Sequence, residues 1–202
     1  MKRFAMLVMT GTMIGFVAPC EAAQYTATLS AANENPPTAS SGTGASTVVL
    51  DTTAHTLSVS VTFSGLTSGT TASHIHCCVA PPNNAGVATT TPTFIGFPLG
   101  VTSGTYSQTF STLAASTWNP AFITSTGGTP ATAEAALAAG LDAGQAYLNI
   151  HTTNFPGGEI RGFLAALSTS SAGIPTLSQW LVGLLATLLL LASWYVLRRR
   201  NS

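Results

Sequence analysis

Charged side chains are scarce in this chain of 202 residues, of which they make up 6%. Lys2 and Arg3 stand at the N-terminus and Arg198–Arg200 near the C-terminus, so Arg161 is the only Lys or Arg between residues 24 and 173. Five acidic residues lie in the same stretch, which leaves it a net charge of 1 − 5 = −4 with His neutral. Phosphate binding requires clustered Lys and Arg. We therefore expect no nucleic-acid partner.

Catalytic motifs are also missing from the sequence. It contains no Gly-x-Ser-x-Gly, no Gly-rich loop for a phosphate and no pair of acidic residues at a convincing spacing. Ser and Thr are abundant, but a hydroxyl nucleophile needs a base and an orienting partner, and few charged residues are present for those roles. We therefore expect a protein that is not an enzyme.

The first 23 residues have the features of a secretory signal peptide. Two basic residues precede an apolar run from Phe4 to Ala18, and small residues follow at Ala22 and Ala23. The alternative, a first transmembrane helix, is disfavoured because the apolar run is short. We expect residues 1–23 to be removed on export from the cytoplasm.

The C-terminal segment contains 17 residues without a charge, from Leu181 to Leu197, followed by an Arg cluster. A helix of this length is about 25 Å long, close to the ~30 Å of a bilayer's hydrocarbon core. We expect a transmembrane helix over about residues 180–197, with the Arg cluster on the cytoplasmic side. Taken alone, this segment predicts a plain membrane anchor.

The residues before this helix are more specific. The stretch I-P-T-L-S-Q-W at 174–180, then the apolar segment and the Arg cluster, resembles the IPTL-CTERM sorting signal, which belongs with the PEP-CTERM class of Gram-negative bacteria. The resemblance covers residues 174–202. It implies that an exosortase-type transpeptidase recognises Ile174, Pro175, Thr176 and Leu177. It also implies an inner-membrane intermediate, followed by delivery to the outer envelope, the cell surface or the medium.

The stretch between the two ends predicts an all-β domain. Apolar and polar residues alternate from His55 to Phe63, which is the pattern of a strand with one buried face. A short helix is expected after Thr129 and Pro130, which suit an N-cap and first position, with Gly140 as its stop. We expect an antiparallel β-sandwich or barrel-like domain over residues 24–167, then a flexible linker at 168–173. Further strands are expected at 25–29, 46–50, 73–77, 105–110, 145–151 and 159–167.

Three segments of this domain resemble the CHRD domain, an extracellular module named for chordin. They are Y-T-A-T-L-S-A-A-N-E-N-P-P at 25–37, A-S-H-I-H at 72–76, and A-Y-L-N-I-H-T-T-N-F-P-G-G-E-I-R-G-F-L at 146–164. The resemblance runs from about Tyr25 to Leu167 and implies an extracellular β fold. In animals the module sits in a protein that binds growth factors of the transforming type, and for bacterial members no activity follows. We expect an exported binding or structural module at the cell surface or in the extracellular matrix, with a surface polysaccharide or a protein as its ligand.

The stretch S-H-I-H-C-C at 73–78 suggests an alternative function. On a strand, His74 and His76 project to one face and Ile75 to the other, and His151 has the same relation to Ile150. If these two strands are neighbours, the three imidazoles converge on a site for Zn or Cu, in a metal-binding protein or a metal-dependent enzyme. The other interpretation is that they make structural hydrogen bonds to the backbone or to hydroxyls. With the isoleucines in the core, the histidines would lie on the outer surface. No other cofactor is expected.

Cys77 and Cys78 are the only cysteines of the exported domain. An oxidising compartment favours a disulfide. The pair could form a disulfide with each other, bridge two molecules, or add thiolate ligands to the histidines. We favour the disulfide between neighbours.

Glu159 and Arg161 alternate with Ile160 in the last expected strand. As an exposed ion pair they would contribute about 0–1 kcal/mol to stability. Since Arg161 is the only strong cation of the domain, we expect it to bind a carboxylate or backbone carbonyls.

Overall fold

The computed structural model describes residues 22–167 and 179–200. They belong to two compact units that divide at Leu167, a β domain and a C-terminal unit. The expected signal peptide, the linker and the four residues of the sorting motif lie outside the described residues, apart from Ala22 and Ala23 at the end of the predicted signal peptide.

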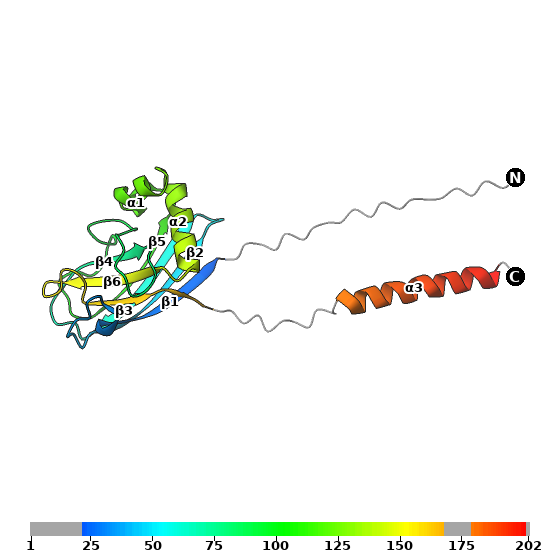
Figure 1. The fold of residues 1–202 in the computed structure, drawn as a ribbon, viewed down its shortest axis with the longest axis horizontal. Helices are drawn as coiled ribbons and strands as arrows, with labels where there is room; N and C mark the ends of the chain where they lie inside the picture. Colours follow the sequence, from blue (N-terminus) through cyan, green and yellow to red (C-terminus); the bar gives the residue numbers. More distant parts are fainter. Residues whose placement is uncertain (1–21, 168–178, 201–202) are drawn as a thin grey trace. The chain divides into compact units, whose positions relative to one another are not determined.

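The β domain is built on one antiparallel sheet (Figure 1). The strand order is β4-β6-β7-β1-β2-β3-β5, and the short β8 also pairs with β1. The strands are β1 (Ala23–Ser30), β2 (Thr43–Asp51), β3 (Thr56–Ser64), β4 (Thr70–Cys77), β5 (Gly104–Ser111), β6 (Ala146–Thr152), β7 (Ile160–Phe163) and β8 (Ala165–Ala166). Strands lie at every expected position, although the one expected at 159–167 is divided into β7 and β8.

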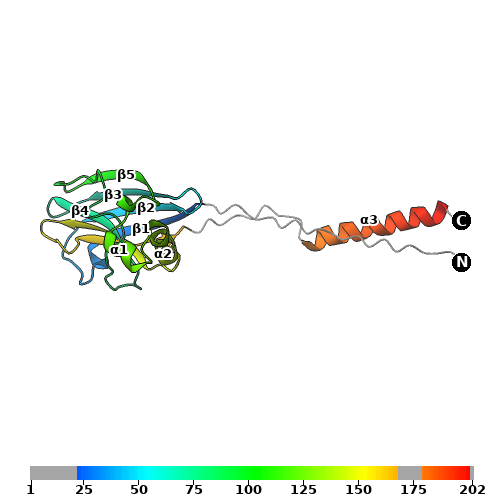
Figure 2. The ribbon, with the colours of Figure 1, turned by 90° about the horizontal axis from the view of Figure 1, so that it is seen from above.

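The sheet curves into a half-barrel, so the expected antiparallel β-sandwich or barrel-like domain is confirmed in its barrel-like form (Figure 2). Apolar residues of β3, such as Val59 and Val61, are buried in one core cluster with α-helical and loop residues such as Leu137 and Phe94. An alternating strand shows only that one of its faces is covered. It does not show whether a second sheet or a helix covers it, which is why the sequence left this open.

The opposite face of β1, β2, β3 and β5 carries hydroxyl groups in register. Thr26 pairs with Thr47, Thr47 with Ser60, and Ser60 with Ser107, so one row of four hydroxyl side chains crosses four strands. Ser60 and Ser107 are exposed and lie 3.1 Å apart between their Oγ atoms. This face is polar but uncharged along these rows.

Two α-helices, α1 (Pro120–Ser125) and α2 (Pro130–Asp142), and two short 3-10 helices, η1 (Ala31–Asn33) and η2 (Ala115–Thr117), complete the domain. The predicted start of α2 is confirmed, since the Thr129 hydroxyl caps the helix and Pro130 is its first residue. The predicted stop at Gly140 is wrong. Gly140 lies inside the helix, where its missing side chain leaves room for the sulfur atoms of Cys77 and Cys78, and the chain turns instead at Gly144, with φ of +64°.

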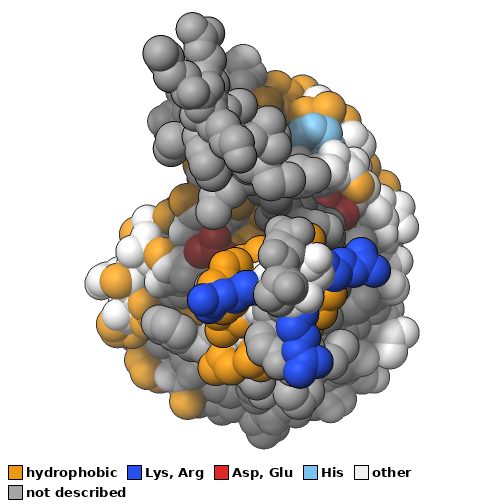
Figure 3. Space-filling model, turned by 90° about the vertical axis from the view of Figure 1, so that its right-hand side faces the viewer, with side chains coloured by type: hydrophobic (Ala, Val, Ile, Leu, Met, Phe, Trp, Pro, Cys, Tyr) orange, Lys and Arg blue, Asp and Glu red, His pale blue; other side chains and the backbone are white. Residues whose placement is uncertain are grey.

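The C-terminal unit contains α3 (Gln179–Arg200), so a helix forms where one was expected. The arginines of its last turn are the blue side chains in Figure 3. Among the described residues, no helix combines the length and the apolar character needed to cross a membrane.

Candidate metal centre

The edge strand β4 pairs with β6 and so brings three histidines together. In this pairing Ile75 lies opposite Leu148, and His74 lies opposite Asn149. Successive side chains of a strand point to opposite faces. The histidine triad (His74, His76 and His151) therefore shares the face of the sheet that lies opposite the apolar core. One ring nitrogen from each member lies within 4.8 Å of the other two.

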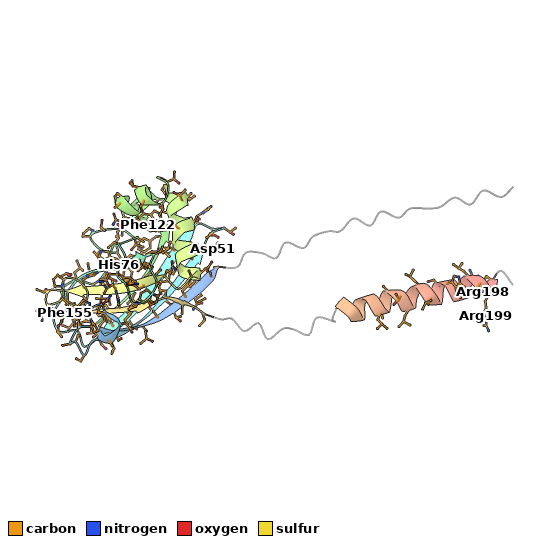
Figure 4. All side chains as sticks on the ribbon, viewed as in Figure 1. Asp51, His76, Phe122, Phe155, Arg198 and Arg199 are labelled. Carbon is orange, nitrogen blue, oxygen red and sulfur yellow. A yellow bond between two sulfur atoms is a disulfide. The ribbon has the colours of Figure 1, made fainter. Side chains whose placement is uncertain are left out.

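The triad is buried, which corrects the expectation that it lies on the outer surface. The exposed fractions are 6% for His74, 8% for His76 and 9% for His151. Two loops cover this face, the long one from 78 to 98 and the turn from 153 to 158 that follows β6. Figure 4 labels His76 within the body of the domain and Phe155, of the turn, at its outer end.

The covering loops also fix the protonation pattern of the rings. One nitrogen of each imidazole bonds a backbone carbonyl oxygen of a loop: His74 Nε2 with Pro92 (2.6 Å), His76 Nδ1 with Ala85 (2.9 Å) and His151 Nδ1 with Pro156 (3.0 Å). A carbonyl oxygen only accepts hydrogen bonds, so each of these nitrogens carries the proton. The second nitrogen of each neutral ring is then a lone-pair donor, and all three are buried without a hydrogen-bond partner.

The environment keeps the triad neutral. Burial lowers the pKa of His74 and of His76 from 6.5 to about 4, although the bonds to the loop carbonyls act in the opposite direction. Burial also lowers the pKa of His151. A metal ion binds the neutral imidazole, so the rings are in the metal-binding form at neutral pH.

The spacing of the ring nitrogens is close to what a bound ion requires. Nitrogens no more than 4.8 Å apart, at the corners of an equilateral triangle, would lie at most about 2.8 Å from its centre (4.8/√3), and Zn–N bonds are about 2.0–2.1 Å long. Each ring would move inward by at most about 0.7 Å to bind. Three neutral imidazoles at this spacing are a donor set that fits zinc or copper.

An aromatic ring and a guanidinium group support the triad from one side. The Tyr147 ring stacks on His76, with centroids 4.8 Å apart and planes 6° apart. The Arg161 guanidinium lies 4.7 Å from the Tyr147 centroid. It donates hydrogen bonds to Asn33 O of η1 (2.5 Å) and to two oxygens of the 78–98 loop, Pro82 O and Asn84 Oδ1 (both 2.6 Å). Arg161 thus ties η1 to this covering loop beside the triad.

The exposed ion pair expected between Glu159 and Arg161 is wrong, because both residues are buried and bond other groups. Glu159 accepts hydrogen bonds from the Ser40 and Thr152 hydroxyls and from the Thr67 amide. Burial raises the pKa of Glu159, but these hydrogen bonds outweigh it and hold the pKa below its usual range. The expectation that Arg161 bonds backbone carbonyls is confirmed.

Glu34 and Asn149 extend the site, and the sequence had given them no role. Glu34 follows η1, is 6% exposed, and lies 3.8 Å from Arg161 Nε through Oε2. Burial raises its pKa to about 7, while Arg161 and a hydrogen bond from the Asn149 side chain lower it. One signal was available, since these residues belong to the N-E-N-P-P and N-I-H-T stretches that carry the family resemblance.

The cysteines are not part of the centre. Cys77 and Cys78 are bonded to each other, and Cys77 lies on the face of β4 opposite His74 and His76. The fourth histidine is elsewhere as well. His55 Nδ1 lies 3.0 Å from Glu134 Oε1 of α2, beside the β2–β3 turn.

In a comparison with known families, residues 25–164 match the CHRD domain. No curated protein and no solved structure matches the chain. The matched range contains every residue of the centre.

Proposed function

This chain belongs to the CHRD domain family, and we propose that its domain binds a transition metal ion, Zn²⁺ or copper, through His74, His76 and His151. The observation that carries the proposal is the orientation of the three rings. Each is held by a loop carbonyl through one nitrogen, its other nitrogen is buried without a partner, and one nitrogen of each ring lies within 4.8 Å of the other two.

The competing interpretation is that the histidines are structural. A structural histidine buried to this extent is expected to have both ring nitrogens bonded, because an unpaired buried polar atom costs about 1–3 kcal/mol. Here three such atoms lie together. A carbonyl bonded to the far nitrogen of a ring is the usual support of a metal-binding histidine. A bound cation would remove all three penalties at once.

The proposal is tested by titrating the metal-free protein with Zn²⁺ and with Cu²⁺ in a calorimeter. We expect one ion per chain, and a loss of affinity of at least about 100-fold in His74→Ala and in His151→Ala. The matched control is His55→Ala, which removes a histidine that is paired with Glu134 outside the centre. Equal affinities in the wild type, in the two triad variants and in the control would rule the proposal out.

A second role is supported by the outer face of the sheet and by the chain ends. We propose that the protein is exported and acts as a binding or adhesive module at the cell surface, with a polysaccharide or a protein as its ligand. The hydroxyl rows offer an uncharged binding face, and a shallow hollow of about 520 Å³ lies beside Thr43, Thr62 and Thr105. The bond between Cys77 and Cys78 fits an oxidising compartment.

Sorting by an exosortase-type transpeptidase remains part of this second proposal. It rests on the I-P-T-L stretch and the Arg cluster at the end of the chain. A variant with Pro175 and Thr176 replaced is expected to stay uncut and cell-associated, whereas the parent protein is released in a shorter form. Mass measurement of the released protein would give both of its termini, and normal release of the variant would contradict the sorting role.

A further inference from the structure

Two more unpartnered polar atoms lie beside the histidine triad. Among the described residues, six buried side-chain nitrogen or oxygen atoms lack a hydrogen-bond partner. Three are the free ring nitrogens, two are Asn149 Oδ1 and Glu34 Oε1, and the sixth is Ser46 Oγ. Unpartnered buried polar atoms are rare in folded proteins. Five of them in neighbouring residues point to a missing partner.

Strand pairing places Asn149 next to the triad. Asn149 lies opposite His74 on one side and opposite Arg161 on the other, and it shares its face of β6 with His151 two residues later. Side chains directly opposite each other on neighbouring strands have Cβ atoms about 4.5–5.5 Å apart. Asn149 is therefore flanked by two members of the triad.

The turn that holds His151 also presses against Asn149 and Glu34. Gly158 has φ of +128°, and a Cβ atom at this position would lie closest to Asn149 Nδ2, 2.8 Å from Asn149 Oδ1 and 2.9 Å from Glu34 Oε1. The Asn149 side-chain amide and the Glu34 carboxyl thus approach the same point from different elements. Asn149 donates its amide hydrogen bond to the Glu34 carboxyl, so its oxygen remains free to accept.

All five atoms are acceptors or lone-pair donors, and none of them has a hydrogen-bond partner. A metal ion would take the lone pairs of the three nitrogens and leave two oxygens without a partner. A water molecule on that ion has two O–H groups to donate, which is the number of oxygens that remain. Metal centres with three protein ligands commonly keep a water in the fourth position.

We infer that the metal ion of this centre carries a water molecule as its fourth ligand, held by hydrogen bonds to Asn149 Oδ1 and Glu34 Oε1. This inference rests on the proposed metal binding. A water ligand is replaceable, so the centre has an open position for a second molecule. With the triad only 6–9% exposed, that molecule is a small anion or a small neutral oxygen or nitrogen donor. The Glu34 carboxylate favours the water and disfavours an anion, because it accepts a hydrogen bond and is negative.

The test uses the full chain loaded with Co²⁺, whose visible absorption reports its ligands, and sodium azide as the probe. We expect azide to change the spectrum of the wild type by replacing the water. In Glu34→Gln, azide is expected to bind about 10-fold more tightly, while the affinity for Co²⁺ changes less than this. The control is Glu134→Gln, which replaces a buried carboxyl of α2 that is paired with His55, away from the triad. This variant is expected to leave the azide affinity unchanged.

A second measurement does not depend on a variant folding. Cu²⁺ bound in the wild type should speed the relaxation of solvent water protons, and azide should abolish the effect. If the metal binds but azide changes neither signal, the water is absent and the inference fails while metal binding stands. Equal azide affinity in the wild type and Glu34→Gln would overturn the role of Glu34. If no metal binds the wild type, the proposed function fails and the inference fails with it.

Discussion

Replacing Glu34 with Gln should change how the stability of the metal-free domain depends on pH, because Glu34 and the histidines act in opposite directions. Burial lowers the pKa of His74 and of His76 from 6.5 to about 4. Between these values the unfolded chain binds protons that the folded domain does not. The contribution of each histidine is therefore fully present above pH 6.5 and is lost as the pH falls toward 4.

The contribution of Glu34 to stability changes with pH in the opposite direction. Burial raises its pKa from 4.5 to about 7, despite Arg161 and Asn149, so the folded domain keeps a proton that the unfolded chain releases. Its contribution is present below pH 4.5 and is lost as the pH rises through about 7. Acidification thus weakens the domain through the two histidines and strengthens it through Glu34.

The magnitudes follow from the shifts. Each of the three groups moves by about 2.5 pH units (6.5 − 4 for the histidines, 7 − 4.5 for Glu34), which is worth about 3 kcal/mol at 1.36 kcal/mol per unit. Acidification from about pH 8 to 4 should lower the free energy of unfolding by about 6 kcal/mol through the two histidines. Over the same range Glu34 should raise it by about 3 kcal/mol. His151, whose pKa is also lowered, adds to the loss.

Glu34→Gln removes the compensating group and should make the acid-induced loss of stability steeper. The difference in free energy of unfolding between the variant and the wild type should shift by about 3 kcal/mol in favour of the variant as the pH rises from about 4.5 to about 8. The assay is urea unfolding in the presence of a chelator at several pH values, followed by fluorescence of the buried Trp118. Parallel stability curves for the variant and the wild type would refute the linkage.

Two further predictions concern packing. Arg161→Met leaves Asn33 O, Pro82 O and Asn84 Oδ1 without their donor and should lower the free energy of unfolding in urea by about 3–5 kcal/mol. A loss below about 1 kcal/mol would contradict the role of Arg161 as the tie between η1 and the 78–98 loop. Gly140→Ala forces a methyl group against the sulfurs of Cys77 and Cys78 and should cost about 1–3 kcal/mol in thermal unfolding. The control Gly86→Ala adds a methyl group with no atom within 4 Å, and equal stability losses in the two variants would argue against the close packing of α2.

Much of the local structure was predictable because it depends on residues close together in the chain. The alternation in β3 sets which side chains are buried, and Thr129 followed by Pro130 sets the start of α2. The same alternation placed His74 and His76 on one face and Ile75 on the other. The sequence by itself therefore determined the strands, the start of the inserted helix and the shared face of the histidines.

Tertiary structure decided what surrounds those elements. The pairing of β4 with β6 joins residues 69 (146 − 77) to 82 (152 − 70) positions apart, and only that pairing brings His151 to His74 and His76. Contacts between distant segments also supply the loop carbonyls that orient the rings, the hydrogen bonds of Arg161 to η1 and the 78–98 loop, and the approach of Glu34 to Asn149. Gly140 also shows that a residue's role can depend on its tertiary neighbours. In the sequence it resembles a helix stop, but in the fold it lies inside α2, because the two sulfurs packed against it leave no room for a side chain.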